Sequence, residues 1–160
     1  KKEVMKLMDD IFFSGTFGGE TLSLAAAKSV LKKIRDGDVI QKIHQTGSKV
    51  LDKVGQLIEL HNVTDIISIS GHPAITYITI KPAYGYSNYE IKTFFLQEMF
   101  KRGILILGSH NISYAHNDDD INSLLMAYNE VFPLIRKTLV DGTLGDYLEV
   151  EPLVPLFKIR

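Results

Sequence analysis

The sequence has no cysteine and no tryptophan, and its charges almost cancel, with 18 Lys and Arg against 19 Asp and Glu. Without cysteine, disulfides, thiol catalysis and cysteine-ligated zinc are excluded. No basic run is present that could follow a phosphate backbone, so nucleic acid is not an expected partner. No apolar stretch approaches the roughly 20 residues of a membrane span, and no signal-like segment precedes the first amphipathic stretch. We therefore expect no membrane partner and a cytoplasmic location.

What is present is a balanced composition of 160 residues, 45% of them hydrophobic, with a net charge of −1. These values are typical of a globular chain of one or two small domains. The chain begins Lys1-Lys2-Glu3 without an initiator methionine and enters helical periodicity at once, which suggests a piece of a longer polypeptide.

Hydrophobic periodicity predicts helices alternating with short strands. Ser87 and Glu90 have the spacing of a capping box, and Gly103 is placed to end the helix that they begin. In the last helix the apolar spacing predicts that Leu125 faces the core. The expected helices cover about residues 4–10, 21–35, 38–62, 88–102 and 118–139, and the expected strands cover 11–13, 66–70, 75–80, 104–107 and 111–116. This order predicts an α+β fold with a small, mostly antiparallel sheet covered on one face by helices.

Histidines and aspartates gather before the last helix, where His110 and His116 bracket Asp118-Asp119-Asp120. A metal site is one interpretation of this group. However, acidic residues at a helix start complement the helix dipole and cap free amides, and the spacing matches no HExxH or calcium-loop motif. Ser70-Gly71-His72 lacks the GxSxG elbow of a hydrolase and is more typical of a hairpin turn. The sequence therefore predicts no metal ligand and no catalytic residue in this chain.

A glycine-rich loop is the strongest local signal, because Gly15, Gly18 and Gly19 occupy three of five positions beside the hydroxyl of Thr16. The loop leads into the helix that starts at Thr21, and glycine amides, a hydroxyl and a helix N-terminus together favour an anion. The motif matches neither GxxxxGK[ST] nor GxGxxG. The alternative is that the glycines only allow tight packing of chain against chain.

The segment from Phe13 to Ala27, FSGTFGGETLSLAAA, resembles the region that follows the Schiff-base lysine in class III pyridoxal-phosphate aminotransferases. The resemblance is strongest to glutamate-1-semialdehyde aminomutases and their relatives. A second match begins at Gly103-Ile104 and continues through Ser113-Tyr114-Ala115-His116 to Asp119-Asp120-Ile121, and it is similar to the closing strand and C-terminal helix of that family. Together the matches cover about residues 1–140.

The resemblance implies the C-terminal portion of the aspartate-aminotransferase-like fold. Residues 1–35 would be the end of the large cofactor-binding domain, 36–140 the small domain and 141–160 an irregular C-terminal extension. The implied cofactor is pyridoxal 5'-phosphate, held in the full-length parent, with Gly15 and Thr16 binding the phosphate that belongs to the other subunit. The implied partners are the parent's own large domain, the second subunit of a homodimer and a small amino or carbonyl substrate.

The resemblance also implies that the Schiff-base lysine lies upstream of Lys1, so that this fragment alone is inactive. Gly19-Glu20 departs from the family, since many members have Asn-Pro there. The alternative function is a non-catalytic interaction or dimerisation module in which the glycine loop is purely structural.

Overall fold

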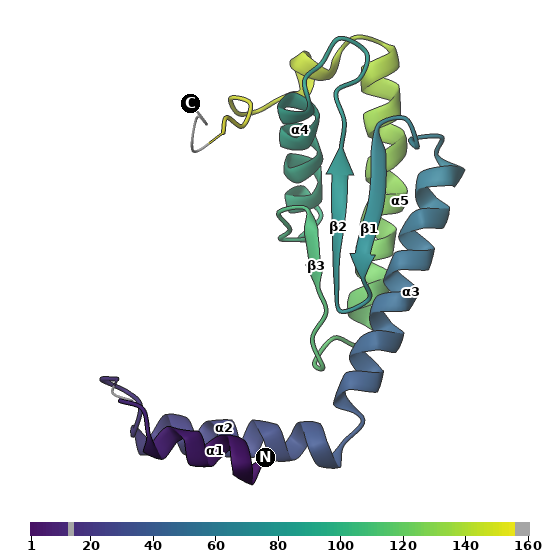
Figure 1. The fold of residues 1–160 in the computed structure, drawn as a ribbon. Coiled ribbons are helices and arrows are strands. Elements are labelled where there is room, and N and C mark those ends of the chain that lie inside the picture. Colours follow the sequence, from purple (N-terminus) through teal and green to yellow (C-terminus); the bar gives the residue numbers. More distant parts are fainter. Residues whose placement is uncertain (13–14, 156–160) are drawn as a thin grey trace. The chain divides into compact units, whose positions relative to one another are not determined.

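The computed structural model describes residues 1–12 and 15–155, and the chain divides into two compact units, Lys1–Val39 and Ile40–Arg160 (Figure 1). The first unit contains α1 (Lys2–Lys6), the 3₁₀ helix η1 (Leu7–Asp9) and α2 (Thr21–Asp36). The strand predicted at 11–13 is not observed at Ile11 and Phe12, and Phe13 lies outside the described residues. Both side chains are exposed, 56% and 95%, so no neighbouring strand supplies the burial and pairing that a strand needs.

Helix α2 begins and ends where the sequence predicts, with Glu20 as its N-cap and Gly37 as its C-cap. The sequence also predicts an inward face formed by Leu22, Ala25, Ala26, Leu31 and Ile34. None of these residues is buried, and Leu22 and Leu31 are 77% and 65% exposed. The caps at its two ends and its helix-favouring residues are enough to define the helix. No other part of the described chain buries its apolar side.

The second unit is an α+β fold, as predicted, with a three-stranded antiparallel sheet of order β1-β2-β3. In the register, Ile69 pairs with Ile78 and Tyr77 pairs with Ser109. Its elements in chain order are α3 (Val39–Leu60), β1 (Ile67–His72), β2 (Ile75–Ile80), α4 (Asn88–Lys101), β3 (Ser109–Asn111), α5 (Asp118–Val140) and the 3₁₀ helix η2 (Leu144–Tyr147).

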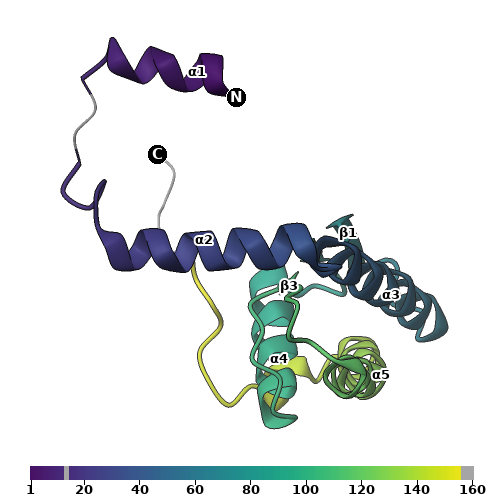
Figure 2. The same cartoon turned by 90° about the horizontal axis from the view of Figure 1, so that it is seen from below.

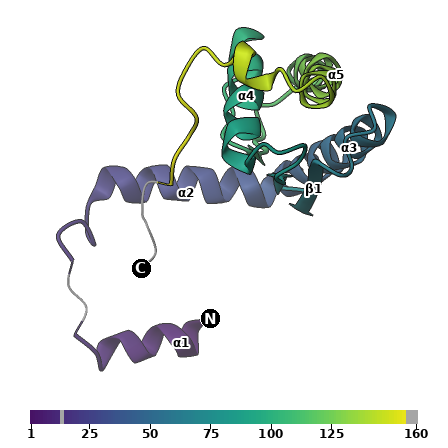
Figure 3. The ribbon, with the colours of Figure 1, turned by 90° about the horizontal axis from the view of Figure 1, so that it is seen from above.

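One face of this sheet is covered and the other is open. Viewed along the strands, α4 and α5 lie on the same side of the sheet (Figures 2 and 3). Thr76 and Ile78 of β2 are buried, whereas Ile75 and Tyr77, which alternate with them, are 38% and 47% exposed. This is the period-2 pattern of a sheet with a single core face. Fully buried core side chains include Val50, Ile66, Ile67, Ile91, Phe94, Phe95, Tyr128, Phe132 and Ile135.

Helix α3 comes into direct contact with the turn between β1 and β2 at Gly47. A Cβ added at Gly47 would overlap the carbonyl oxygen and carbon of Pro73 and would lie 3.0 Å from the Cα of Pro73. At Gly55, two turns further along the helix, an added Cβ would meet nothing within 4 Å. Glycine is therefore required by packing at the first position and not at the second.

No strand is observed at 104–107, and the strand predicted at 111–116 is observed only at its first residue, because the third strand is the three-residue β3, Ser109–Asn111. Residues 104–107 keep a strand-like alternation, with Ile106 buried and Leu105 and Leu107 exposed at 88% and 74%. Residues 104–107 pair with no strand among the described residues. The next residue, Gly108, accepts a hydrogen bond at its carbonyl oxygen from Ile78 N of β2.

The segment 141–160, predicted to be irregular, differs from that expectation at η2, where Leu144 is fully buried. From Leu148 to Pro155 the described chain has no helix or strand. Across the described part of the chain, none of the helices has the length and apolar character needed to cross a bilayer.

Candidate functional site

The glycine loop forms two successive tight turns ahead of α2. Gly18 N donates to Gly15 O at 3.0 Å, and Glu20 N donates to Phe17 O at 3.2 Å. Thr16 and Phe17 are both exposed at the outside of these turns. The loop therefore presents its hydroxyl and its aromatic ring to the surroundings of the first unit.

Nothing within the described chain requires glycine at Gly15 or Gly19. Neither residue has a positive φ, and a Cβ added at either would meet nothing within 4 Å. The alternative prediction is that these glycines allow one chain segment to pack tightly against another. No such contact is present at Gly15 or Gly19 within the described chain. The space beside them is open to a group from outside this unit.

The start of α2 is already capped by a carboxylate of the chain itself. Glu20 Oε1 accepts a hydrogen bond from Leu22 N at 2.7 Å, and Oε2 accepts one from Ser23 N at 2.6 Å. Hydrogen bonds from Ser23 and Leu22 lower the pKa of Glu20 below its usual value. This corrects the prediction that the helix N-terminus offers its amides to an anion, since the cap occupies two of them.

The donors that remain lie in the loop itself. Among residues 1–12 and 15–155, no hydrogen bond engages the hydroxyl or amide of Thr16 or the amide of Phe17. A hydroxyl and adjacent amides are suited to the oxygens of a phosphate group. The residues present therefore fit the phosphate of a cofactor, and they supply neutral donors rather than a countercharge.

His110 of β3 takes part in a buried polar cluster and is not free to bind a metal. Its Nδ1 lies 2.6 Å from Thr76 Oγ1, and its Nε2 lies 2.6 Å from Tyr128 Oη, so both ring nitrogens are hydrogen-bonded. Burial lowers the pKa of His110 to about 4 and raises the pKa of the Tyr128 hydroxyl. The imidazole is therefore neutral at pH 7 and ties the sheet to α5. Thr76 and Tyr128 were not predicted from the sequence, because they lie 34 and 18 residues from His110 and share no local motif with it.

The other residues of the predicted histidine and aspartate group have separate structural roles. His116 Nδ1 accepts a hydrogen bond from Ser113 N at 3.2 Å, and Asp118 pairs with Lys49 of α3 at 2.7 Å. Asn117 and Asp120 form a capping box at the start of α5. In the described part of the chain, no three His, Asp or Glu side chains come together as metal ligands would. The structure thus supports the capping interpretation of this segment.

Comparison with known proteins gives partial matches to longer enzymes, although no protein-family model matches the chain. It is 24% identical over 148 residues to glutamate-1-semialdehyde 2,1-aminomutase 2 of Geobacillus kaustophilus, which covers 85% of this chain and 34% of that protein. It is 23% identical over 141 residues to glutamate-1-semialdehyde 2,1-aminomutase of Archaeoglobus fulgidus, covering 81% and 34%. The chain therefore spans about a third of the length of the curated relatives that it matches.

Several solved structures share the fold, among them the following two. One is the PLP internal aldimine form of the FumI protein of Sphingopyxis sp. MTA144, with a TM-score of 0.69 and 22% identity over 82% of this chain and 31% of that one. The other is a transaminase with PLP bound, with a TM-score of 0.66 and 16% identity over 83% of this chain and 31% of that one. The fold of this chain matches the C-terminal part of these structures, which confirms the predicted α+β fold. Together with the aminomutase matches, it confirms the resemblance inferred from the sequence.

Proposed function

We propose that this chain is the C-terminal part of a class III pyridoxal-phosphate-dependent aminotransferase or aminomutase, an enzyme that moves an amino group between a substrate and its cofactor. The observation that carries the proposal is the agreement of two independent comparisons. The sequence is similar to aminomutases, and the fold is that of the C-terminal part of transaminases.

In the parent enzyme, Gly15 and Thr16 bind the phosphate of the cofactor that belongs to the other subunit of a homodimer. The unengaged Thr16 hydroxyl and the neighbouring amides support this role, and so does the open space beside Gly15. When bound, pyridoxal phosphate supplies an electron sink for the substrate's carbanion. The contribution of this chain is to orient the cofactor through its phosphate.

The partners of this chain are the large domain of its own polypeptide, a second subunit and a small amino or carbonyl substrate. Support comes from apolar surface left uncovered in each unit. Leu22 and Leu31 of α2 are exposed in the first unit, and Tyr77 and Leu105 are exposed in the second. Such surface is typical of faces that another domain covers. Because the lysine that binds the cofactor lies outside this chain in the family, the fragment by itself is inactive.

The decisive test uses the whole polypeptide and compares Thr16→Val with wild type. Losing one hydrogen bond to a charged phosphate costs about 1.5 to 3 kcal/mol, so the cofactor dissociation constant should rise about 10- to 150-fold. Equilibrium dialysis against pyridoxal phosphate measures it. Thr21→Val, which removes an exposed hydroxyl five residues away, is the matched control and should leave the constant unchanged. Equal affinities for wild type and the Thr16 variant would exclude this role for the hydroxyl.

A second test uses the 160-residue chain alone. Mixing it with pyridoxal phosphate and reducing with borohydride should leave no single lysine stoichiometrically modified, because the specific lysine is expected elsewhere. Peptide mapping by mass spectrometry provides the readout. Complete modification at one lysine would contradict the proposed division of roles.

The second candidate function is a non-catalytic interaction or dimerisation module. The apolar surface left uncovered on α2 favours it, since a partner protein could cover the same side chains. In that case the whole polypeptide binds no pyridoxal phosphate, and Thr16→Val changes association between chains instead. The two candidates are therefore separated by the same pair of variants.

A further inference from the structure

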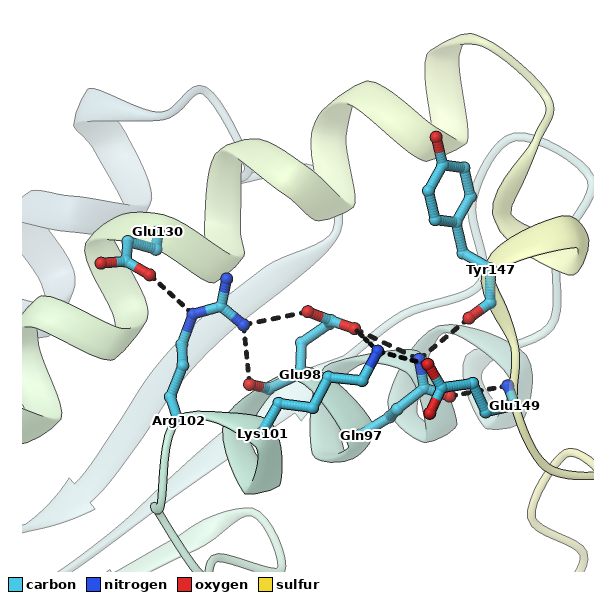
Figure 4. Close-up of polar contacts among 7 residues, drawn as sticks. All are labelled: Gln97, Glu98, Lys101, Arg102, Glu130, Tyr147 and Glu149. Atoms are coloured by element: carbon cyan, nitrogen blue, oxygen red, sulfur yellow. Dashed lines mark hydrogen bonds and ion pairs between the residues drawn. The ribbon is translucent and has the colours of Figure 1, made fainter.

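The segment Leu148–Pro155, here called the strap, is held across α4 by side chains that bind its backbone. The carboxamide of Gln97 accepts a hydrogen bond from Glu149 N of the strap at 2.8 Å and donates one to Tyr147 O, just before the strap, at 2.9 Å (Figure 4). Further along, Leu153 N donates to Thr93 Oγ1 at 2.8 Å. Thr93 and Gln97 are one helical turn apart, so a single face of α4 holds the strap at both of its ends.

Charged side chains join this attachment to the rest of the second unit. Lys101 Nζ lies 2.6 Å from Glu149 of the strap and 2.9 Å from Glu98 of α4. Arg102 bonds to Glu98 at 2.9 Å and to Glu130 of α5 at 2.8 Å, which completes the network drawn in Figure 4. Burial acts to raise the pKa of Glu98, but hydrogen bonds from Lys101, Arg102 and Gln97 outweigh it and lower the pKa. The carboxylate is therefore charged at neutral pH.

A cavity of about 360 Å³ lies between α4 and the strap. Its apolar walls are Leu96 and Phe100 from the helix and Val150 and Leu153 from the strap. This volume falls within the range of small-molecule sites in proteins, about 300 to 1,000 Å³. The cavity is partly open, because Phe100, Val150 and Leu153 are 45%, 61% and 41% exposed, and its apolar walls favour an apolar molecule.

The polar residues around this cavity are already engaged by the protein. Thr93 donates to Tyr89 O and accepts from Leu153 N, and the carboxamide of Gln97 is bonded on both sides. Lys101 and Glu149 neutralise each other. A ligand with a charge or a strong hydrogen-bonding group would therefore find no free polar side chain among the described residues that line the cavity.

We propose that the cavity between α4 and the strap binds a small, uncharged, apolar molecule, which the strap covers on one side. The site is independent of the cofactor role assigned to Gly15 and Thr16. A second apolar groove, between α3 and α5 and lined in part by Leu60 and Met126, provides an internal comparison within the same unit.

The experiment titrates benzene into the methyl-labelled 160-residue chain and follows methyl signals by nuclear magnetic resonance. The expected result is saturable shifts at Leu96, Val150 and Leu153, with Leu60 and Met126 unchanged. Val150→Asp places a charge on the cavity wall and should weaken binding about tenfold or more. Leu60→Asp is the matched control, because the two side chains are 61% and 66% exposed and neither substitution disturbs the core.

Gln97→Ala tests the strap, since it removes both bonds to the backbone at Tyr147 and Glu149. It should weaken benzene binding while leaving the methyl signals of Ile91 and Ile135, which are fully buried in the core, unchanged. The proposal is overturned if benzene produces no saturable shift, if the α3 and α5 groove responds equally, or if Val150→Asp binds like wild type. Binding that appears only after residues 156–160 are deleted would also overturn it, because the protein itself would then fill the cavity.

Discussion

The contrast between Gly47 and Gly55 of α3 gives the sharpest test of the packing in the second unit. Alanine is favoured over glycine in a helix interior by about 1 kcal/mol, so both Gly→Ala changes begin with the same gain. At Gly55 the new methyl group would meet no atom within 4 Å, so no steric cost offsets this gain. The free energy of unfolding should therefore rise by about 1 kcal/mol. At Gly47 the new methyl group would overlap the backbone carbonyl of Pro73.

No side-chain rotation can relieve an overlap between a Cβ and a backbone carbonyl, so the helix and the turn must separate. Overpacking of this kind costs about 1 to 3 kcal/mol, and the upper end applies because backbone atoms are involved. After the gain in helix propensity is subtracted, Gly47→Ala should lower the free energy of unfolding by about 2 kcal/mol. The two variants should thus differ by about 3 kcal/mol, or about 1.5 M in the urea midpoint.

Tyrosine offers a probe that reports on the second unit alone. The chain has seven tyrosines and no tryptophan, and every tyrosine lies between residues 77 and 147. Urea unfolding followed by the near-ultraviolet circular dichroism of tyrosine therefore leaves the first unit unseen. If Gly47→Ala proves as stabilising as Gly55→Ala, the close approach of α3 to Pro73 is refuted.

Three further predictions concern the same unit. Because the pKa of His110 is about 4 when folded and 6.5 for a free histidine, the unfolded chain binds a proton first as the pH falls. The contribution of neutral His110 to the free energy of unfolding is fully present above pH 6.5. Below that pH the free energy of unfolding should fall by about 1.4 kcal/mol per pH unit, until folded His110 itself titrates near pH 4. Urea midpoints between pH 7 and pH 5 measure this fall, and His110→Gln should flatten it. Ile135→Ala, at a fully buried site, should cost about 2 to 5 kcal/mol in thermal or urea unfolding. Leu125→Ala should cost clearly less, since Leu125 is only partly buried despite its predicted place in the core, and equal costs would contradict this burial order. Asn117→Ala removes the cap of α5 and should cost about 1 kcal/mol, visible as a lower urea midpoint, whereas an unchanged midpoint would mean that the cap adds nothing.

Local signals predicted the helices well. The capping box of Ser87 and Glu90 marks the start of α4, and Gly103, with φ of 76°, follows its end as predicted. Gly37 likewise follows the end of α2, which lies within one residue of the expected limit. Such signals work because the atoms that cap a helix lie within a few residues of the amides or carbonyls that they satisfy.

The third strand was misplaced because pairing depends on a distant partner. Residues 104–107 have the apolar, β-branched composition of a strand, yet the pairing with β2 begins at Ser109, opposite Tyr77. The Thr76, His110 and Tyr128 cluster was missed for the same reason, since its members meet only after the sheet and α5 are assembled. In the glycine loop the sequence predicted donors for an anion, but the capping role of Glu20 became visible only from the side-chain geometry.

If the proposed phosphate site is correct, the carboxylate that caps α2 determines how the parent protein would acquire its cofactor. Since Glu20 already satisfies the first-turn amides, α2 needs no bound phosphate in order to form. Loading the coenzyme would then be uncoupled from the folding of this helix, and the helical content of the apo and holo proteins should be the same in this region. Affinity would not be reduced by an ordering cost, and the compensating positive charge would have to come from another part of the assembly.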